Sequence, residues 1–300
     1  MSLPNTTKSI HLERETFDRA VEVSDGFWMI ATRHRPGFMK MQPEVNNRCL
    51  IFRVRDQKRN EDVLVVSNGV DPKVIPEVRR IERETGLSVR TILSPGGGHH
   101  LLMPAWRDEF TRAEILVCPV RVPNIASAEP LMRGGRVRAM DLVNPLPEFA
   151  GELEAVVFHG LYGFADMKTP FEGKKEGFFT MFSMMKEMMS LKTPDDELWL
   201  HHVPTGTVIG GENLGWILSE KTVKSFPLMM RPMMKVNTVY VQDKARKVSD
   251  PRVVRDCWKR ILDWPGRTLI GYHEPPGEGF LGDTRAELGR AVRQVGQLSD

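Results

Sequence analysis

Cysteine is scarce in this 300-residue chain, which holds only Cys49, Cys118 and Cys257. They are odd in number and far apart, and none belongs to a Cys-x-x-Cys pair. This pattern excludes a disulfide framework and is typical of a protein from a reducing compartment. Cys118 lies in an apolar segment, so we expect its thiol to be buried rather than nucleophilic.

Long apolar runs are absent as well. No window of about 18 residues is uninterrupted by polar side chains, so we expect no transmembrane segment. The N-terminal stretch MSLPNTTKSIHLERETF lacks the apolar core of a secretory signal. Together these absences lead us to expect a cytoplasmic protein.

The chain also lacks an excess of charge of either sign. Its 42 basic and 39 acidic residues leave a net charge of +3. No run of Lys or Arg stands beside interleaved aromatic residues, so we expect no nucleic-acid partner. The 41% apolar and 27% charged content is that of an ordinary globular protein, long enough for one large domain or two small ones.

Strands and helices are expected to alternate along the chain. Apolar, β-branched or aromatic runs between turn residues predict strands at 21–32, 47–56, 62–69, 88–95, 114–119, 153–159 and 266–275. Apolar stripes at helical spacing, with capping and stop signals, predict helices at 71–86, 105–110, 249–266 and 282–298. This alternation predicts an α/β protein in which helices cover a sheet.

Individual residues indicate where three of these elements begin, end or break. Asp71 is placed to cap the helix that Gly86 closes, and Thr284 and Glu287 have the spacing of a capping box at the last helix. Residues 198–211 predict a strand pair broken at Pro204. In this pair we expect His201 to face solvent or an interface, and His202 to be a core or a pocket residue.

The segment SPGGGHHLLMPAW, residues 94–106, places two adjacent histidines after three glycines at the end of a predicted strand. Loops at strand ends are where functional groups are expected. The glycines indicate a phosphate cradle only weakly, because no Lys-Ser/Thr pair or GxGxxG frame accompanies them. For the loop that carries His99 and His100, a metal site and a plain turn remain as the two alternatives.

Several motifs, in a fixed order along nearly the whole chain, resemble one family. NNRCLIF, with Asn47, stands where that family has an Asn ahead of a Leu-Ile pair, and VLVVSNG ends in residues 67–69 where the family has Asp-Thr-Gly. Later segments, VVFHG, VIGGEN and IGYHEP, place His159, Glu212 and His273 where the family has a histidine, an acidic residue and a last histidine. This series resembles the metallo-β-lactamase fold superfamily.

The glycine-rich loop stands where the family has the motif T-H-x-H-x-D-H. Aligned side by side, the first two histidines of the motif become Pro95 and Gly97, the aspartate becomes His99, and the last histidine is His100. The downstream HHLLMPAW and AEILVCP segments look like an uncharacterised branch in which the first histidine pair is similarly eroded.

The resemblance implies an αββα sandwich, formed by residues 1–300 as a single domain with a Met-rich insertion at about 163–196. The family binds two metal ions, and the first site cannot form here because Pro and Gly offer no side-chain ligand. The second site implies one divalent ion, Zn²⁺ or Fe²⁺, or no ion at all if the site is fully lost.

The implied site residues form two overlapping sets. His100, His159, Glu212 and His273 are the expected metal ligands. His99, His100 and Glu212 are the expected catalytic groups, with Glu212 or a metal-bound water acting as base or nucleophile.

Methionine is abundant, and nine of the 17 methionines fall in the two short stretches 178–191 and 226–236. Those in the first stretch have helical spacing, which favours a core-facing helix. A flexible apolar lid over the site and a homodimer interface are the alternatives. In the lid interpretation, the residues expected to line a pocket for an apolar small molecule are Met181, Met185, Met188, Trp106 and Met230.

We therefore expect a hydrolase that acts on a lipophilic ester, lactone or thioester through a reduced, mononuclear metal site. The alternatives are a mononuclear non-haem iron oxidoreductase, a metal-independent isomerase or lyase on the same fold, and a catalytically dead binding protein. Hydrolysis of β-lactams is not expected, because the ligands of the first site are missing.

Overall fold

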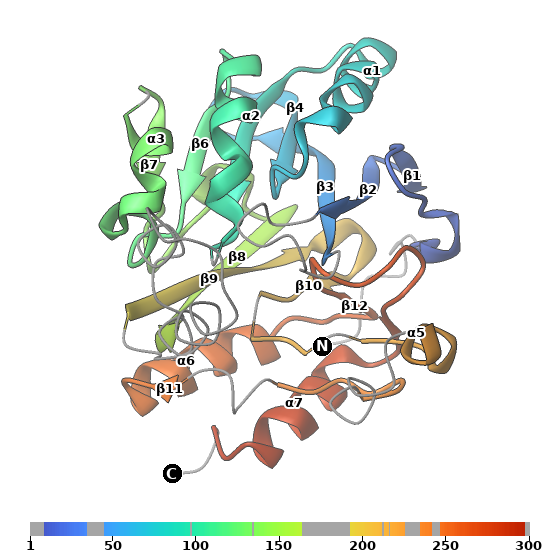
Figure 1. Cartoon of the computed structure of the whole chain (residues 1–300), viewed down its shortest axis with the longest axis vertical. Helices are drawn as coiled ribbons and strands as arrows, with labels where there is room; N and C mark the ends of the chain where they lie inside the picture. The colour runs from blue at the N-terminus through green and yellow to red at the C-terminus, as the bar shows by residue number, and fades with distance from the viewer. Residues whose placement is uncertain are drawn as a thin grey trace, which may run out of the picture.

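The structure, a computed structural model, describes residues 9–34, 45–96, 98–133, 135–163, 193–211, 213–215, 217–225, 235–241 and 247–297. Among these residues, the strands form a seven-stranded sheet in the order β1-β2-β3-β4-β5-β6-β7 and a six-stranded sheet in the order β11-β8-β9-β10-β12-β13 (Figure 1). The strands of the first sheet are β1 (Val21–Ser24), β2 (Phe27–His34), β3 (Val45–Asp56), β4 (Glu61–Ser67), β5 (Val89–Ser94), β6 (Glu114–Val117) and β7 (Val137–Ala139). Those of the second are β8 (Leu153–Gly163), β9 (Thr193–His202), β10 (Thr207–Ile209), β11 (Lys247–Val248), β12 (Thr268–Ile270) and β13 (Phe280–Leu281).

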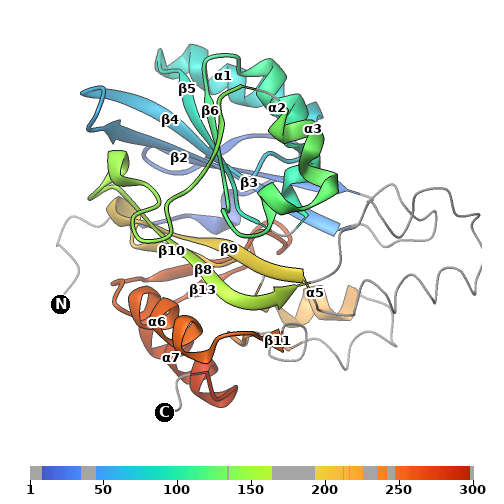
Figure 2. The same cartoon turned by 90° about the vertical axis from the view of Figure 1, so that its left-hand side faces the viewer.

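Helices cover the outer face of each sheet. The α-helices are α1 (Ile75–Thr85), α2 (Met103–Glu109), α3 (Glu129–Met132), α5 (Glu220–Ser225), α6 (Pro251–Leu262) and α7 (Thr284–Gln294). Short 3-10 helices include η3 (His99–Leu102) and η5 (Ala126–Ala128). Figure 2 shows α1, α2 and α3 on one side of the two sheets and α6 and α7 on the other. This four-layer arrangement confirms the predicted αββα sandwich.

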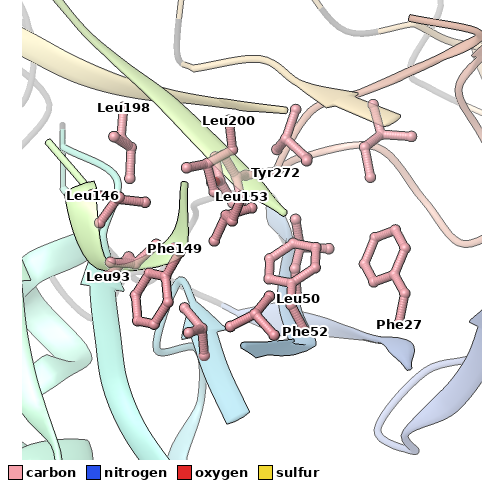
Figure 3. Packing of buried hydrophobic residues seen from close by; sticks show 14 of the residues in the cluster. Phe27, Leu50, Phe52, Leu93, Leu146, Phe149, Leu153, Leu198, Leu200 and Tyr272 are labelled. Atoms are coloured by element: carbon pink, nitrogen blue, oxygen red, sulfur yellow. The ribbon is translucent and has the colours of Figure 1, made fainter. Parts of the chain in front are cut away.

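Three apolar clusters hold the layers together. Alternate residues of the strands face opposite ways, so each sheet contributes to the central cluster and to one outer cluster. In the central cluster Phe27 stacks on Phe52 with ring centroids 4.8 Å apart, and Leu198 and Leu200 of β9 face them from the second sheet (Figure 3). The outer clusters lie under α1 and α2 on one side, and under α6 and α7 on the other.

Most predicted elements are present, and two of the differences in their bounds have a clear physical reason. The strand predicted at 21–32 is a hairpin, because Gly26 adopts φ +71° and reverses the chain between β1 and β2. The insertion predicted at 163–196 ends earlier, because β9 already begins at Thr193. Asp195 and Asp196 are buried strand residues, and their charge hid this part of the strand in the sequence.

Helix ends follow the capping signals in two cases and depart from them in one. Asp71 accepts a hydrogen bond from the Lys73 main chain ahead of α1, and Gly86 closes that helix at φ +71°. The last helix is capped by Asp283, which accepts from the Ala286 N–H, rather than by Thr284. A carboxylate one position earlier makes the same N-cap bond, so the capping-box spacing pointed to the wrong residue.

The topology brings several strand ends to one edge of the molecule. Strands β4, β5, β6 and β7 run parallel to one another, and so do β10 and β12 in the second sheet. Parallel neighbours end at the same edge, so the loops that follow them lie together. No helix in the part of the chain that the structure describes has the length and apolar character needed to span a bilayer.

Candidate active site

His99 and His273 meet where the two sheets end. His99 opens η3 beyond β5, and His273 lies three positions beyond Ile270, the last residue of β12. Their rings stack with centroids 5.1 Å apart and planes inclined by 22°. Two imidazoles separated by most of the chain thus form one pair.

The Nδ1 atom of each ring faces a carbonyl oxygen. His99 Nδ1 lies 2.8 Å from Asn68 Oδ1, and His273 Nδ1 lies 2.8 Å from the main-chain oxygen of Asn46. A carbonyl oxygen only accepts, so both histidines carry a proton on Nδ1. In the neutral ring the lone pair is therefore on Nε2, as it is in a metal ligand or a general base.

Asn68 is itself held in a fixed orientation. Its Nδ2 donates to the main-chain oxygen of Arg48 at 2.8 Å, which turns Oδ1 toward His99. Its backbone has φ +70°, a conformation that Asn tolerates better than most side chains. The preceding Ser67 places its Oγ 2.8 Å from the hydroxyl of Tyr272, whose ring lies 5.5 Å from that of His99. The Ser-Asn-Gly sequence, which stands where the related motif has Asp-Thr-Gly, thus supports the pair from behind.

Arg48 ties the last loop to the rest of the site. Its side chain is fully buried, and its guanidinium pairs with Glu15 and with Glu274 at 2.9 Å each. It also donates to the main-chain oxygens of Gly271 at 3.3 Å, Pro275 at 2.9 Å and Glu278 at 2.7 Å. These bonds fix both sides of His273.

The main chain of Arg48 reaches the histidine pair as well. Its N–H donates to Tyr272 O at 2.8 Å, and its carbonyl accepts from Asn68. One residue of β3 therefore positions the groups behind both imidazoles.

The first half of the glycine-rich loop is joined to the second sheet by main-chain contacts. Leu198 N–H donates to Pro95 O at 2.9 Å, and Gly96 forms a β-bridge with Glu197. Gly96 has φ +104°, and a Cβ there would lie 2.5 Å from Asp196 O. Protein backbone thus fills the space beside Pro95, one of the two positions that correspond to the lost histidines.

Asp196, beside this bridge, is an unusual acid. Its carboxylate accepts from the N–H groups of Val120 at 2.6 Å and Arg121 at 2.9 Å. Burial raises the pKa of Asp196 to about 6, and the two hydrogen bonds offset only part of that effect. Cys118 lies in the same region and is fully buried, as expected. Burial raises the pKa of its thiol well above the ordinary value.

The structure separates two other predicted ligands from the pair. His100 turns its Nε2 to Ser127 Oγ at 2.9 Å. His159 lies on β8, where burial, followed by the charge of Arg260, lowers its pKa. No hydrogen bond or ring contact given for the described residues joins His159 to His99, His100 or His273.

Trp106, expected in the substrate pocket, is instead a core residue. Its ring is fully buried between α2 and the first sheet, stacks on Phe110 and donates through Nε1 to Val70 O at 2.7 Å. The other expected pocket residues, Met181, Met185, Met188 and Met230, lie outside the described residues.

Glu212 also lies outside the described residues, but its neighbours are placed. Ile209 of β10 pairs with Ile270 of β12 in parallel register, and Glu212 and His273 each follow these residues by three positions. The N–H of Asn213 donates to Glu197 at 3.0 Å, and the N–H of Gly210 donates to Ile270 O at 2.8 Å. The described residues on either side of position 212 therefore lie at the same sheet edge as the His273 loop.

The two remaining histidines of the strand pair are structural. His202 is buried against Phe27 and Phe52, which confirms a core position. His201 was expected at the surface but is buried, stacked on Trp264 with its Nδ1 3.1 Å from Glu154. The alternation of β9 turns it toward the layer of α6, whose following loop covers it.

The two imidazoles of His99 and His273 are fewer ligands than a metal site needs. No group of three or more His, Cys, Asp or Glu side chains within the described ranges is arranged to hold one. His99 and His273 supply two imidazoles with the tautomer that ligands require, and a catalytic zinc site has three protein ligands. These two residues therefore fit one metal ion only when a third ligand joins them. A second metal ion does not fit, because backbone of β9 occupies the space beside Pro95 and Gly96.

Comparisons with known proteins agree with this architecture. No protein-family model matches the chain, and no curated protein matches it in sequence. Among solved structures, a metallo-β-lactamase from Pontibacter korlensis is 9% identical with a TM-score of 0.50, over 93% of this chain and 98% of that one. A β-lactamase domain protein from Burkholderia ambifaria is 11% identical with a TM-score of 0.50, over 95% of this chain and 80% of that one.

The chain thus has the metallo-β-lactamase fold, as the order of its motifs implied. At these identities the likeness shows the fold alone, and function has to be argued from the site.

Proposed function

We propose that this protein is a hydrolase whose working groups are His99 and His273. The observation that carries the proposal is the tautomer of the two stacked rings, each with its Nδ1 proton held by a carbonyl oxygen. Side chains that serve only as packing do not require this arrangement, whereas metal ligands and general bases do.

One divalent ion, Zn²⁺ or Fe²⁺, fits this proposal, with Glu212 as the ligand that joins the two imidazoles. A bound ion would supply Lewis acidity and acidify a water molecule. Gly210 and Asn213, on either side of Glu212 in the sequence, donate hydrogen bonds to Ile270 O and to the Glu197 carboxylate, which supports its inclusion.

The chain's own residues define what the site does with a proton. Asn68 keeps the Nδ1 proton of His99 in place, which leaves the Nε2 lone pair to serve as a metal ligand, or as the acceptor of a proton from water when no ion is bound. The Nδ1 proton of His273 is held in the same way by Asn46 O. His99 is 8% exposed, which limits competing water around it.

The substrate class is proposed as a lipophilic ester, lactone or thioester. This part rests on the methionine-rich stretches of the sequence, because methionine forms adaptable apolar surfaces. Hydrolysis of such substrates needs one activated water and one polarised carbonyl, which is within reach of a mononuclear site.

The test is metal content measured by plasma mass spectrometry, beside hydrolysis of p-nitrophenyl esters of increasing acyl length. The proteins compared are the full chain, His99→Ala, His273→Ala and Glu212→Gln, with His11→Ala as the control at an exposed histidine. We expect about one ion per chain in the full protein and in His11→Ala, and loss of the ion in the three site variants.

Two results would contradict the proposal. One is an unchanged metal content in His99→Ala and His273→Ala, which would place the ion elsewhere. The other is the absence of both metal and esterase activity in the full protein after reconstitution with Zn²⁺ and Fe²⁺.

A further inference from the structure

A second pair of polar side chains lies next to His99 and is separate from the groups proposed to bind a metal ion. His100 belongs to η3 and Ser127 to η5, and His100 Nε2 lies 2.9 Å from Ser127 Oγ. A nucleophile and its base must lie within about 2.6–3.2 Å of each other, and this pair does. We propose that Ser127 is a nucleophile activated by His100 and is acylated by small activated esters with an apolar acyl group.

Both side chains are held by their own turns. The N–H of Leu101 donates to Gly98 O at 3.2 Å, and the N–H of Ala128 donates to Ile125 O at 3.2 Å, which closes the two 3-10 turns. His100 is 3% exposed and Ser127 is 8% exposed, so both residues are largely shielded from solvent. The pair is therefore preorganised, and Ser127 is the more exposed of the two residues.

Two exposed apolar residues are direct neighbours of the pair in the sequence. Leu101, the residue after His100, is 43% exposed, which is unusual for a large apolar side chain in the described part of this protein. Ala126, directly before Ser127, is exposed as well. An apolar acyl chain would gain from the removal of these side chains from water. These two residues are the reason for assigning an apolar acyl group.

The reaction balances without a metal ion or an oxidant. Ser127 Oγ bonds to the ester carbonyl carbon, its proton passes to His100 Nε2, and the bond to the leaving oxygen breaks as that oxygen takes the proton. Water then attacks the acyl-serine, giving up a proton to His100 Nε2, and the proton returns to Ser127 as the acid is released. His100 must be neutral and protonated on Nδ1 for the first step.

This chemistry goes beyond the metal-dependent hydrolysis proposed above, because it uses neither His273 nor Glu212. The two proposals can therefore be contradicted by separate results. Loss of metal affects only the first, and loss of the Ser127 hydroxyl affects only the second.

The experiment is covalent labelling of the full chain with a fluorophosphonate, followed by mass spectrometry of its peptides. Attack by Ser127 Oγ forms a bond to phosphorus and expels fluoride, and His100 takes the hydroxyl proton. We expect the label on Ser127, no change in its rate with EDTA, and no label at that site in Ser127→Ala. General-base assistance contributes about 10²-fold to 10⁴-fold, so His100→Ala should slow labelling by at least about 10²-fold.

Ser24→Ala is the matched control, since Ser24 on β1 is also 8% exposed but no hydrogen bond among the described residues joins its hydroxyl to a histidine. Its labelling rate should equal that of the unchanged chain. Circular dichroism checks folding, and His100→Gln replaces His100→Ala if the latter does not fold. A folded protein with no label on Ser127, or with an equal rate in the His100 variants, overturns the proposal and leaves the pair as a clamp between η3 and η5.

Discussion

Arg48 connects parts of the chain that are very far apart in sequence. Its partners include Glu15 near the start of the described residues and Glu274 near the end, and all three are buried. A buried charge is tolerated only when opposite charges and hydrogen bonds surround it. The loop that carries His273 therefore depends on one guanidinium.

We expect Arg48→Met to lower the free energy of unfolding by about 3–5 kcal/mol, because it leaves two carboxylates buried without a counter-charge. Urea denaturation followed by circular dichroism measures this change. Arg53→Met on the same strand is the control, since its pair with Asp25 is solvent-exposed and worth about 0–1 kcal/mol. Equal losses in the two variants would argue against a role for burial.

His202 makes stability depend on pH. Burial lowers its pKa from 6.5 to about 3, so the folded chain leaves it neutral where the unfolded chain already binds a proton. The free energy of unfolding should therefore fall as the pH drops below about 6.5, by about 1.4 kcal/mol per pH unit for this one group, until the folded pKa is reached. In the non-titrating variant His202→Gln, this slope should be smaller by the contribution of one proton, which is about 1.4 kcal/mol per pH unit.

Urea unfolding between pH 4 and pH 7 tests the prediction, with the exposed His11→Gln as control. A slope that is the same in His202→Gln and in the unchanged protein would show that another group causes the acid sensitivity.

At the scale of elements, the glycine-rich loop acts as a junction between the two sheets. It leaves β5 of the first sheet and pairs with β9 of the second through Pro95 and Gly96. In the metal-binding form of the motif this region carries ligands, whereas here it carries main-chain hydrogen bonds. The junction needs a glycine at position 96, because neighbouring backbone leaves no room for a side chain.

We expect Gly96→Ala to destabilise the protein by about 1–3 kcal/mol, since its Cβ would lie 2.5 Å from Asp196 O and 3.0 Å from Glu197 Cα. Gly135→Ala is the control, because a Cβ there meets nothing within 4 Å. The thermal midpoints of the two variants measure the difference. If they match, the contact between Gly96 and β9 is looser than the structure shows.

At the scale of the whole molecule, the sequence predicts the layers better than the site. Period-2 and helical patterns, together with the order of the motifs, identify the αββα sandwich, because burial of one face of each element leaves a local signal. The same order of motifs places His273 among the expected metal ligands, but it names His100 rather than His99 as the ligand from the glycine-rich loop. It does not show that His99, rather than His100, stacks on His273, because adjacent loop residues have no fixed period.

The supporting residues leave no local signal at all. Ser67 and Tyr272 are 205 positions apart, and Arg48 and Glu274 are 226 positions apart. The residue type of Asn68 does not reveal its role, yet its amide orients His99. Such contacts exist only once the two sheets have packed, so residue types and spacings alone do not predict them.

The bridge between Gly96 and Glu197 also limits how this loop can be redesigned. The carbonyl of Pro95 accepts a hydrogen bond from Leu198 N–H, so a change that re-aims residue 95 would open main-chain bonds to β9. Opening them lowers stability before any bound ligand can compensate for it. New chemistry is therefore better engineered at His99 and His273, whose rings meet without using this junction.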